Sequence, residues 1–222
     1  MLGNKKNAFW EAFLIAGVVF ILGLLLGLFV EQNRVQQVND YFSEAETSLI
    51  DSVALSNSLD IGNNCQDLIS TNIQFADSIY QQAVLLEQYE QAGKISDSIM
   101  IAHKKYDLLR TILWQNLIKI NDKCPGKFNF VIYLYNYNPP GLNEKAVQNV
   151  WSKILYELKQ KEGSNVVLVP ISASSNLSSL NYLMKEFNVS DLPAVIINDK
   201  TVVYNLTSTA DLEKYLIKPN AF

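Results

Sequence analysis

The run from Ala8 to Val30 constrains this chain most, because it is almost entirely apolar and Glu11 is its only charged residue. About 20 consecutive apolar residues are enough to cross the hydrocarbon core of a bilayer as an α-helix. Phe9 and Trp10 lie at one end of the run, where aromatic side chains favour the membrane interface and Glu11 can reach it. The sequence therefore predicts one N-terminal transmembrane helix over residues 8–30.

A cleaved signal peptide is the alternative interpretation of this run. The apolar core of a signal peptide spans about 7–15 residues, and no small-x-small cleavage site follows Val30. Lys5 and Lys6 precede the run, so the positive-inside rule places residues 1–7 in the cytoplasm and the chain from Glu31 onward outside. We expect a single-pass cell-membrane protein, anchored in the lipid bilayer, whose C-terminal part is extracytoplasmic.

Composition excludes several classes of function. Hydrophobic residues make up 49% of the 222 residues and the net charge is −4, which excludes wholesale disorder and gives no basic surface for nucleic acid. Two cysteines and one histidine leave little material for a metal site, and we expect neither a metal nor another cofactor. The histidine, His103, falls beside the apolar pattern of its segment and is expected to be solvated.

The segment 31–122 contains no proline, and its only glycines are Gly62 and Gly93. Its apolar residues recur at spacings of three and four, which is typical of coiled-coil-like helix packing. We expect an extracytoplasmic three-helix stalk, whose stripes pack within the bundle or form a surface for homo-oligomerisation. The predicted helices are 31–60, 64–92 and 95–122. Their stripes comprise Val35, Val38, Phe42, Ala45 and Leu49; Ile69, Ile73, Ala76, Tyr80 and Ala83; and Ile99, Ala102, Tyr106, Leu109, Leu113 and Asn116.

After Pro125 and Gly126 the pattern changes to alternating helices and strands. The aromatic and β-branched residues from Phe128 to Tyr135 predict a central strand. The continuous apolar run 166–171 predicts a strand of a sheet covered on both faces. The remaining predicted elements are helices at 144–162, 176–187 and 209–217, and a hairpin of strands 194–197 and 201–204 around Asn198-Asp199-Lys200.

The stretch Val189-Ser190-Asp191-Leu192-Pro193, directly before an apolar strand, carries a family resemblance. With the order strand, helix, strand, helix, hairpin, helix over residues 127–218, it resembles the thioredoxin-like superfamily. In that family a cis proline opens a strand beside the active site. The resemblance implies an α/β thioredoxin-like domain over 127–218 and a cis Leu192–Pro193 bond.

Active members of the family carry a Cys-x-x-Cys motif where the first helix begins, because a helix N-terminus stabilises a thiolate. Residues 135–142 contain no cysteine, so the family's disulfide exchange does not carry over. The backbone beside the family's proline pairs with bound peptide, which leaves a binding role, although a purely structural Pro193 is the alternative. The binding groove implied by the resemblance comprises Tyr135, Tyr137, Asn138, Pro139, Pro140, Leu192 and Pro193.

Cys65 and Cys124 are the two cysteines. Residues that face one another across an antiparallel helix hairpin have a constant sum of residue numbers, and this pair nearly matches the sum set by a turn at Gly93-Lys94. We expect a structural disulfide, favoured by an oxidising compartment. Free buried thiols and a catalytic pair are the alternatives.

Three N-glycosylation sequons also fall in the C-terminal domain, at Asn176, Asn188 and Asn205.

The leading functional hypothesis is a membrane-anchored, redox-inactive thioredoxin-like domain with no catalytic residues, presented to bind an unidentified protein or peptide. The second is a thiol-disulfide oxidoreductase that uses Cys65 and Cys124. The third is a structural subunit of a membrane complex, for which Gly23-x-x-x-Gly27 supplies a helix-contact motif.

Overall fold

The computed structural model describes residues 5–57, 64–91 and 97–218. The chain forms two compact units, Met1–Tyr41 and Phe42–Phe222. Helix α1 (Lys5–Asn57) contributes to both units, because the boundary between Tyr41 and Phe42 falls within it. It continues without a break past the end of the predicted membrane span at Val30. The predicted turns at Gly62 and at Gly93-Lys94 lie outside the described residues.

The first unit contains the apolar part of α1. The segment Phe9–Asn33 is long and apolar enough to span a membrane, and its most apolar window buries none of its surface within the protein. Phe20, for example, exposes 70% of its surface. The predicted apolar N-terminal helix is confirmed, whereas its orientation in a membrane stays a prediction.

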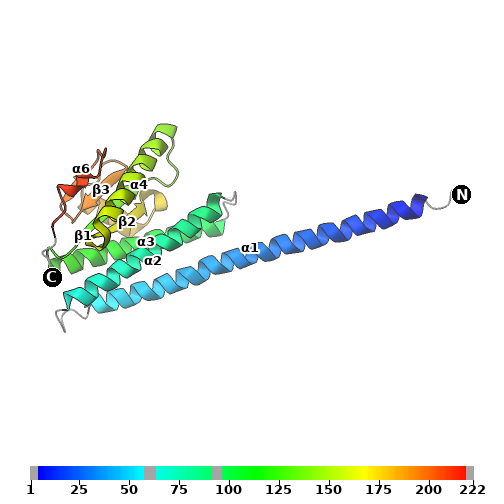
Figure 1. Cartoon of the computed structure of the whole chain (residues 1–222), viewed down its shortest axis with the longest axis horizontal. Coiled ribbons are helices and arrows are strands. Elements are labelled where there is room, and N and C mark those ends of the chain that lie inside the picture. The colour runs from blue at the N-terminus through cyan, green and yellow to red at the C-terminus, as the bar shows by residue number, and fades with distance from the viewer. Residues whose placement is uncertain (1–4, 58–63, 92–96, 219–222) are drawn as a thin grey trace. The chain divides into compact units, whose positions relative to one another are not determined.

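In the second unit, α2 (Cys65–Gln91) and α3 (Asp97–Lys123) form an antiparallel hairpin (Figure 1). The amide of Asn116 donates to the side-chain oxygen of Asn72 at 2.8 Å across the hairpin, and both residues are buried. The predicted stripe of α3 is buried from Ala102 to Asn116. The helices predicted at 64–92 and 95–122 are therefore present with bounds shifted by one or two residues.

The predicted pairing of the two cysteines is confirmed. The sulfur atoms of Cys65 and Cys124 lie 1.99 Å apart and their Cα atoms 5.9 Å apart. This distance fits a disulfide, for which Cα atoms lie within about 7 Å. The bond ties the first residue of α2 to the residue that follows α3.

A mixed four-stranded sheet follows the hairpin, with the strand order β2-β1-β3-β4. The central strand β1 pairs in parallel with β2 and antiparallel with β3, which in turn pairs antiparallel with β4. All four strands lie within one residue of their predicted bounds. The strands are β1 (Asn129–Tyr135), β2 (Val166–Ser172), β3 (Ala194–Ile197) and β4 (Thr201–Val203).

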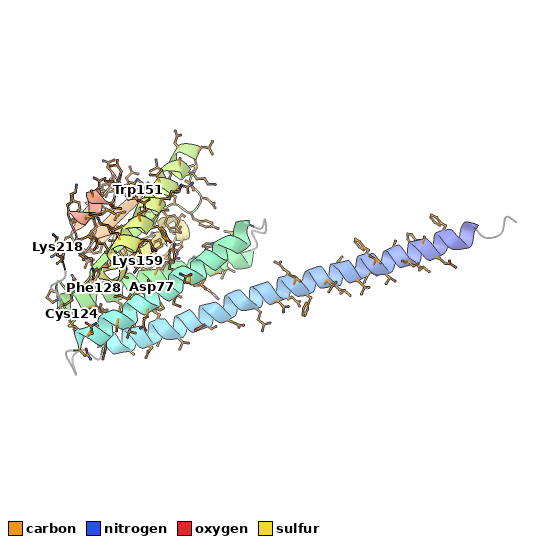
Figure 2. All side chains as sticks on the ribbon, viewed as in Figure 1. Asp77, Cys124, Phe128, Trp151, Lys159 and Lys218 are labelled. Carbon is orange, nitrogen blue, oxygen red and sulfur yellow. A yellow bond between two sulfur atoms is a disulfide. The ribbon has the colours of Figure 1, made fainter. Side chains whose placement is uncertain are left out.

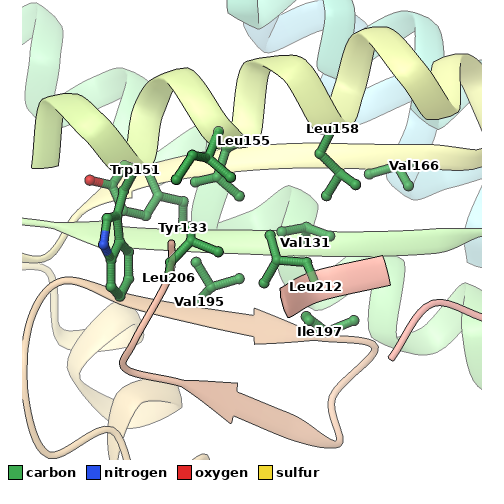
Figure 3. Packing of buried hydrophobic residues seen from close by; sticks show 11 residues of the cluster. Val131, Tyr133, Trp151, Leu155, Leu158, Val166, Val195, Ile197, Leu206 and Leu212 are labelled. Atoms are coloured by element: carbon green, nitrogen blue, oxygen red, sulfur yellow. The ribbon is translucent and has the colours of Figure 1, made fainter. Parts of the chain in front are cut away.

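One face of the sheet is covered by α4 (Leu142–Glu162) and the short α6 (Ala210–Glu213). Figure 3 shows Val131 and Tyr133 of β1 below the α4 side chains Trp151, Leu155 and Leu158. The α6 residue Leu212 closes the same cluster. Helix α4 also carries Lys159, which forms an ion pair with Asp77 of α2 at 3.3 Å (Figure 2).

On the opposite face of the sheet, α3 and α2 pack against β2, and α5 (Ser178–Glu186) packs against α3. Successive side chains of a strand point to opposite faces, so Phe130, Ile132 and Leu134 lie on this second face, and all three are completely buried. Between α3 and α5, the ring of Trp114 stacks on Phe187 with centroids 5.2 Å apart. Figure 1 shows α3 running alongside the sheet.

This packing differs from the predicted arrangement of a stalk over 31–122 and a separate domain over 127–218. Helices α2 and α3 lie in the same compact unit as the sheet. The sheet is apolar on both faces, and α5, with nine residues, is too short to cover the second face alone. The hairpin therefore completes that layer.

The C-terminal end departs most from its predicted bounds. A helix was predicted over 209–217, but α6 ends at Glu213. The side chain of Asn129 instead holds the segment that follows, because its oxygen accepts the Ile217 N–H and its amide donates to the Ile217 carbonyl, both at 2.8 Å. Asn198, at the hairpin turn, donates to the same Asn129 oxygen. These bonds replace a last helical turn.

Candidate binding pocket

An open pocket of about 420 Å³ lies where the carboxyl end of β1, the first turn of α4 and the α5–β3 connection meet. Its volume falls in the range of small ligand sites, about 300–1,000 Å³. The pocket has polar groups and apolar side chains on its wall. The lining residues are Asn136, Glu144, Met184, Val189, Ser190, Asp191 and Leu192.

The first wall is fixed by the buried side chain of Gln148 in α4. Its oxygen accepts the backbone N–H of Asn136 at 2.7 Å, and its amide donates to the Asn136 carbonyl at 3.1 Å. The Asn136 amide donates in turn to the carboxylate of Glu144. The turn after β1 is therefore held rigidly against α4, with the Glu144 carboxylate beside the pocket.

The second wall is the segment from Val189 to Leu192. The Ser190 N–H donates to the hydroxyl oxygen of Tyr204 at 3.0 Å, and that hydroxyl donates to the Asn188 carbonyl at 3.2 Å. The carboxylate of Asp191 accepts the backbone N–H of Leu192 at 2.8 Å. The Leu192–Pro193 bond that follows is cis, as predicted.

Helix α3 contacts the loop that follows the pocket residue Asn136. The ring of His103 lies 4.6 Å from the ring of Tyr137, one residue beyond the pocket-lining Asn136. The Tyr137 N–H donates to the hydroxyl oxygen of Ser174, which also bonds the hydroxyl of Ser172. His103 is half-buried in this contact, which differs from the predicted solvated position.

Asp107, one helical turn after His103, is buried and bonds to the sheet. Its carboxylate accepts the Ser172 N–H at 3.1 Å and lies 3.5 Å from the Arg110 guanidinium. Burial raises the pKa of Asp107, and the Arg110 charge and the Ser172 N–H oppose that rise. The contact pins the end of β2 to α3, so it fixes the frame in which the pocket forms.

The predicted groove and the observed pocket share one lining residue, Leu192, and Pro193 follows it directly. Tyr135 instead packs against the α4 core and stacks on Tyr133, with ring centroids 5.4 Å apart. Tyr137 packs against His103. The loop residues Asn138, Pro139 and Pro140 are exposed or half-exposed and do not line the pocket.

Sequence reasoning missed Asn136, Glu144 and Met184 as pocket residues. Residues 189–191 belong to the stretch that suggested the site, so a signal for them was present in the sequence. Glu144 lies in the first turn of a helix predicted to begin there. Met184 carried no signal, because its place in the wall depends on how α5 packs.

The pocket contains no thiol. Both cysteines of the chain form the Cys65–Cys124 disulfide, and Cys124 exposes only 2% of its surface. Within residues 5–57, 64–91 and 97–218, no cluster of three His, Cys, Asp or Glu side chains is arranged to hold a metal ion. The lining side chains offer carboxylate, amide and hydroxyl groups together with apolar surface.

The three sequon asparagines lie on the surface. Asn176, Asn188 and Asn205 are all exposed, and the first two adopt the left-handed conformation that suits asparagine in turns. Their use as glycan acceptors stays a prediction.

No protein-family model, curated protein or solved structure matches this chain.

Proposed function

We propose that this chain is a single-pass membrane protein that presents a redox-inactive thioredoxin-like domain outside the cytoplasm, where the pocket binds a segment of a protein or peptide. The observation that carries the proposal is the open pocket at the carboxyl end of β1, formed without any cysteine. The elements that border it are those expected to frame a thioredoxin-like site: the end of the first strand, the start of the next helix and the segment before Pro193.

The sheet supports the thioredoxin-like assignment. The order β2-β1-β3-β4, with one parallel pair and an antiparallel hairpin, fits the strand, helix, strand, helix, hairpin, helix pattern of the family. Many α/β folds share a βαβ pair, so the hairpin opened by Pro193 is the more specific part of the pattern.

Anchoring in a membrane is supported by the apolar part of α1. A contiguous apolar surface on every side of a helix is costly in water and stable in lipid. Lys5 and Lys6 precede the span, and disulfides persist in oxidising compartments. These features favour an extracytoplasmic second unit. Protease added to intact cells is expected to degrade it, and protection from the protease would reverse the orientation.

Site-specific photo-crosslinking in native membranes tests the binding function. A photoreactive residue at Leu192, in the pocket wall, is expected to form adducts with a polypeptide. The same residue at Tyr156 serves as the matched control, because Tyr156 is 49% exposed and lies about 18 Å further along α4 than Glu144, at about 1.5 Å per residue. Ser190→Trp, which fills the pocket, is expected to abolish the Leu192 adducts. Equal adducts from both positions would contradict the proposal.

The two alternative functions have their own tests. An oxidoreductase needs a thiol that a substrate can reach; Cys124 is buried, whereas Cys65 is half-buried. We expect no insulin reduction, so activity that Cys124→Ser abolishes would establish the enzyme instead. A structural subunit would self-associate or co-purify in a fixed complex, and crosslinking in membranes that yields only monomer would count against self-association.

A further inference from the structure

We infer that the pocket takes a basic side chain, the lysine or arginine of the bound segment, with its cationic end between Glu144 and Asp191. This inference rests on the proposed binding of a polypeptide segment and names the chemistry that the segment must carry. The two carboxylates come from different walls of the pocket, since Glu144 lies in α4 and Asp191 in the α5–β3 connection. A cation placed in the pocket therefore has two carboxylates in the wall that can bind it.

Among the residues that the structure describes, Glu144 and Asp191 have no ion-pair partner within 4.0 Å. Glu144 accepts one bond from the Asn136 amide and Asp191 accepts one from the Leu192 N–H. Each of these bonds uses one carboxylate oxygen, which leaves the second oxygen of each group to accept from an ammonium or guanidinium.

The apolar part of the wall fits the stem of the same side chain. Met184, Val189 and Leu192 line the pocket and are half-buried. Lysine and arginine place their methylene stems on apolar surface while the charged end stays at a polar site. Methionine adapts to stems of different shape, which suits a pocket that accepts either residue.

An anionic ligand fits the pocket poorly. The N-terminal turn of α4 would favour an anion through its free N–H groups, but Glu144 lies in that turn and offsets the partial positive charge. Lys145 and Lys185 neighbour pocket residues in the sequence without lining the pocket. The charged side chains that line the pocket are therefore the two carboxylates, Glu144 and Asp191.

Methyl NMR of the full chain in lipid nanodiscs tests the inference. The three methionines can be labelled at their methyl groups; Met184 lies in the wall, and Met100 of α3, 55% exposed, serves as the internal control. N-acetyl-arginine amide and N-acetyl-lysine amide are expected to shift the Met184 signal saturably and to leave the Met100 signal in place. N-acetyl-norleucine amide, with a stem and no charge, is expected to bind about three-fold or more weakly, and N-acetyl-glutamate amide weaker still.

Charge-neutralising variants give the decisive comparison. Glu144→Gln and Asp191→Asn each keep an oxygen that can accept the existing internal bond and remove only the charge. Each is expected to weaken the arginine and lysine amides about two- to five-fold, and the double variant to remove their advantage over norleucine amide. Glu157→Gln, on the exposed part of α4, is the matched control and is expected to change nothing. Unchanged affinity in the double variant, or equal binding of the glutamate amide, would overturn the inference.

Crosslinking separates this inference from the proposed function. Segments captured at Leu192 are expected to carry lysine or arginine at the point of attachment. Captured segments without a basic residue would overturn the inference while polypeptide binding stands. Charge-dependent binding of the arginine amide without any captured polypeptide would sustain the pocket chemistry and refute polypeptide binding.

Discussion

Reduction of the Cys65–Cys124 disulfide is expected to lower the free energy of unfolding by about 4 kcal/mol. The bond joins residues 59 positions apart, so it closes a long loop in the unfolded chain. In the chain-entropy model, reopening a loop of this length returns about 14 cal/mol/K to the unfolded state, or about 4 kcal/mol near room temperature. The loop contains the whole of α2 and α3, so the loss of stability should fall mainly on this hairpin.

Urea unfolding of the full chain in nanodiscs, followed by tryptophan fluorescence, measures the effect. Trp114 is completely buried and stacks on Phe187, so its emission reports the packing of α3 on α5. The reduced protein should unfold at lower urea, with a steeper dependence because its unfolded chain is more expanded.

The double variant Cys65→Ala, Cys124→Ala is the companion to reduction. A loss below about 1 kcal/mol in both samples would refute the loop-closure argument. A loss in the double variant without a loss on reduction would assign the effect to packing around the buried Cys124 instead.

Three further predictions concern single residues of the second unit. Burial raises the pKa of Asp199 from 3.8 to about 6. Above about pH 6 the buried carboxylate is charged and lowers the stability of the folded state, and this penalty disappears as the pH falls. In urea unfolding, Asp199→Asn should therefore stabilise the protein more at about pH 8 than at about pH 4. Gln148→Ala should cost about 1–3 kcal/mol and reduce Leu192 crosslinking, because both its bonds to Asn136 are lost, whereas exposed Asn149→Ala should do neither. Trp114→Ala should cost about 3–5 kcal/mol in thermal or urea unfolding, against about 0.5 kcal/mol or less for Tyr182→Ala, which is 64% exposed.

Local sequence patterns were enough to predict the helices, the strands and the pairing of the two cysteines. The apolar run in α1 and the β-branched run in β1 each have one stable local solution, so the sequence predicts both. The cysteine pairing followed because straight antiparallel helices fix which residues face each other. The bond between Asn72 and Asn116, about two helical turns along the same hairpin, obeys the same rule.

Local patterns could not predict what each apolar face contacts. The stripe from Ala102 to Asn116 shows that one side of α3 is buried, and the choice between a neighbouring helix and the sheet depends on long-range packing. The pocket depends on the same information, because Met184 and Glu144 meet residues 189–192 only when α4 and α5 pack at their observed positions. The chain after α6 is held by hydrogen bonds between Asn129 and Ile217, which lie 88 residues apart in the sequence. A local pattern cannot predict such a contact.

The position of α3 against the sheet has a consequence for synthesis of the chain. Proteins are made from the N-terminus, so α2, α3 and both cysteines leave the ribosome before any strand does. The side of α3 that carries Trp114 packs against β2 and α5 in the folded protein. It therefore stays uncovered until both elements have been made. If the disulfide forms during that interval, the hairpin presents an apolar surface on which the strands can assemble.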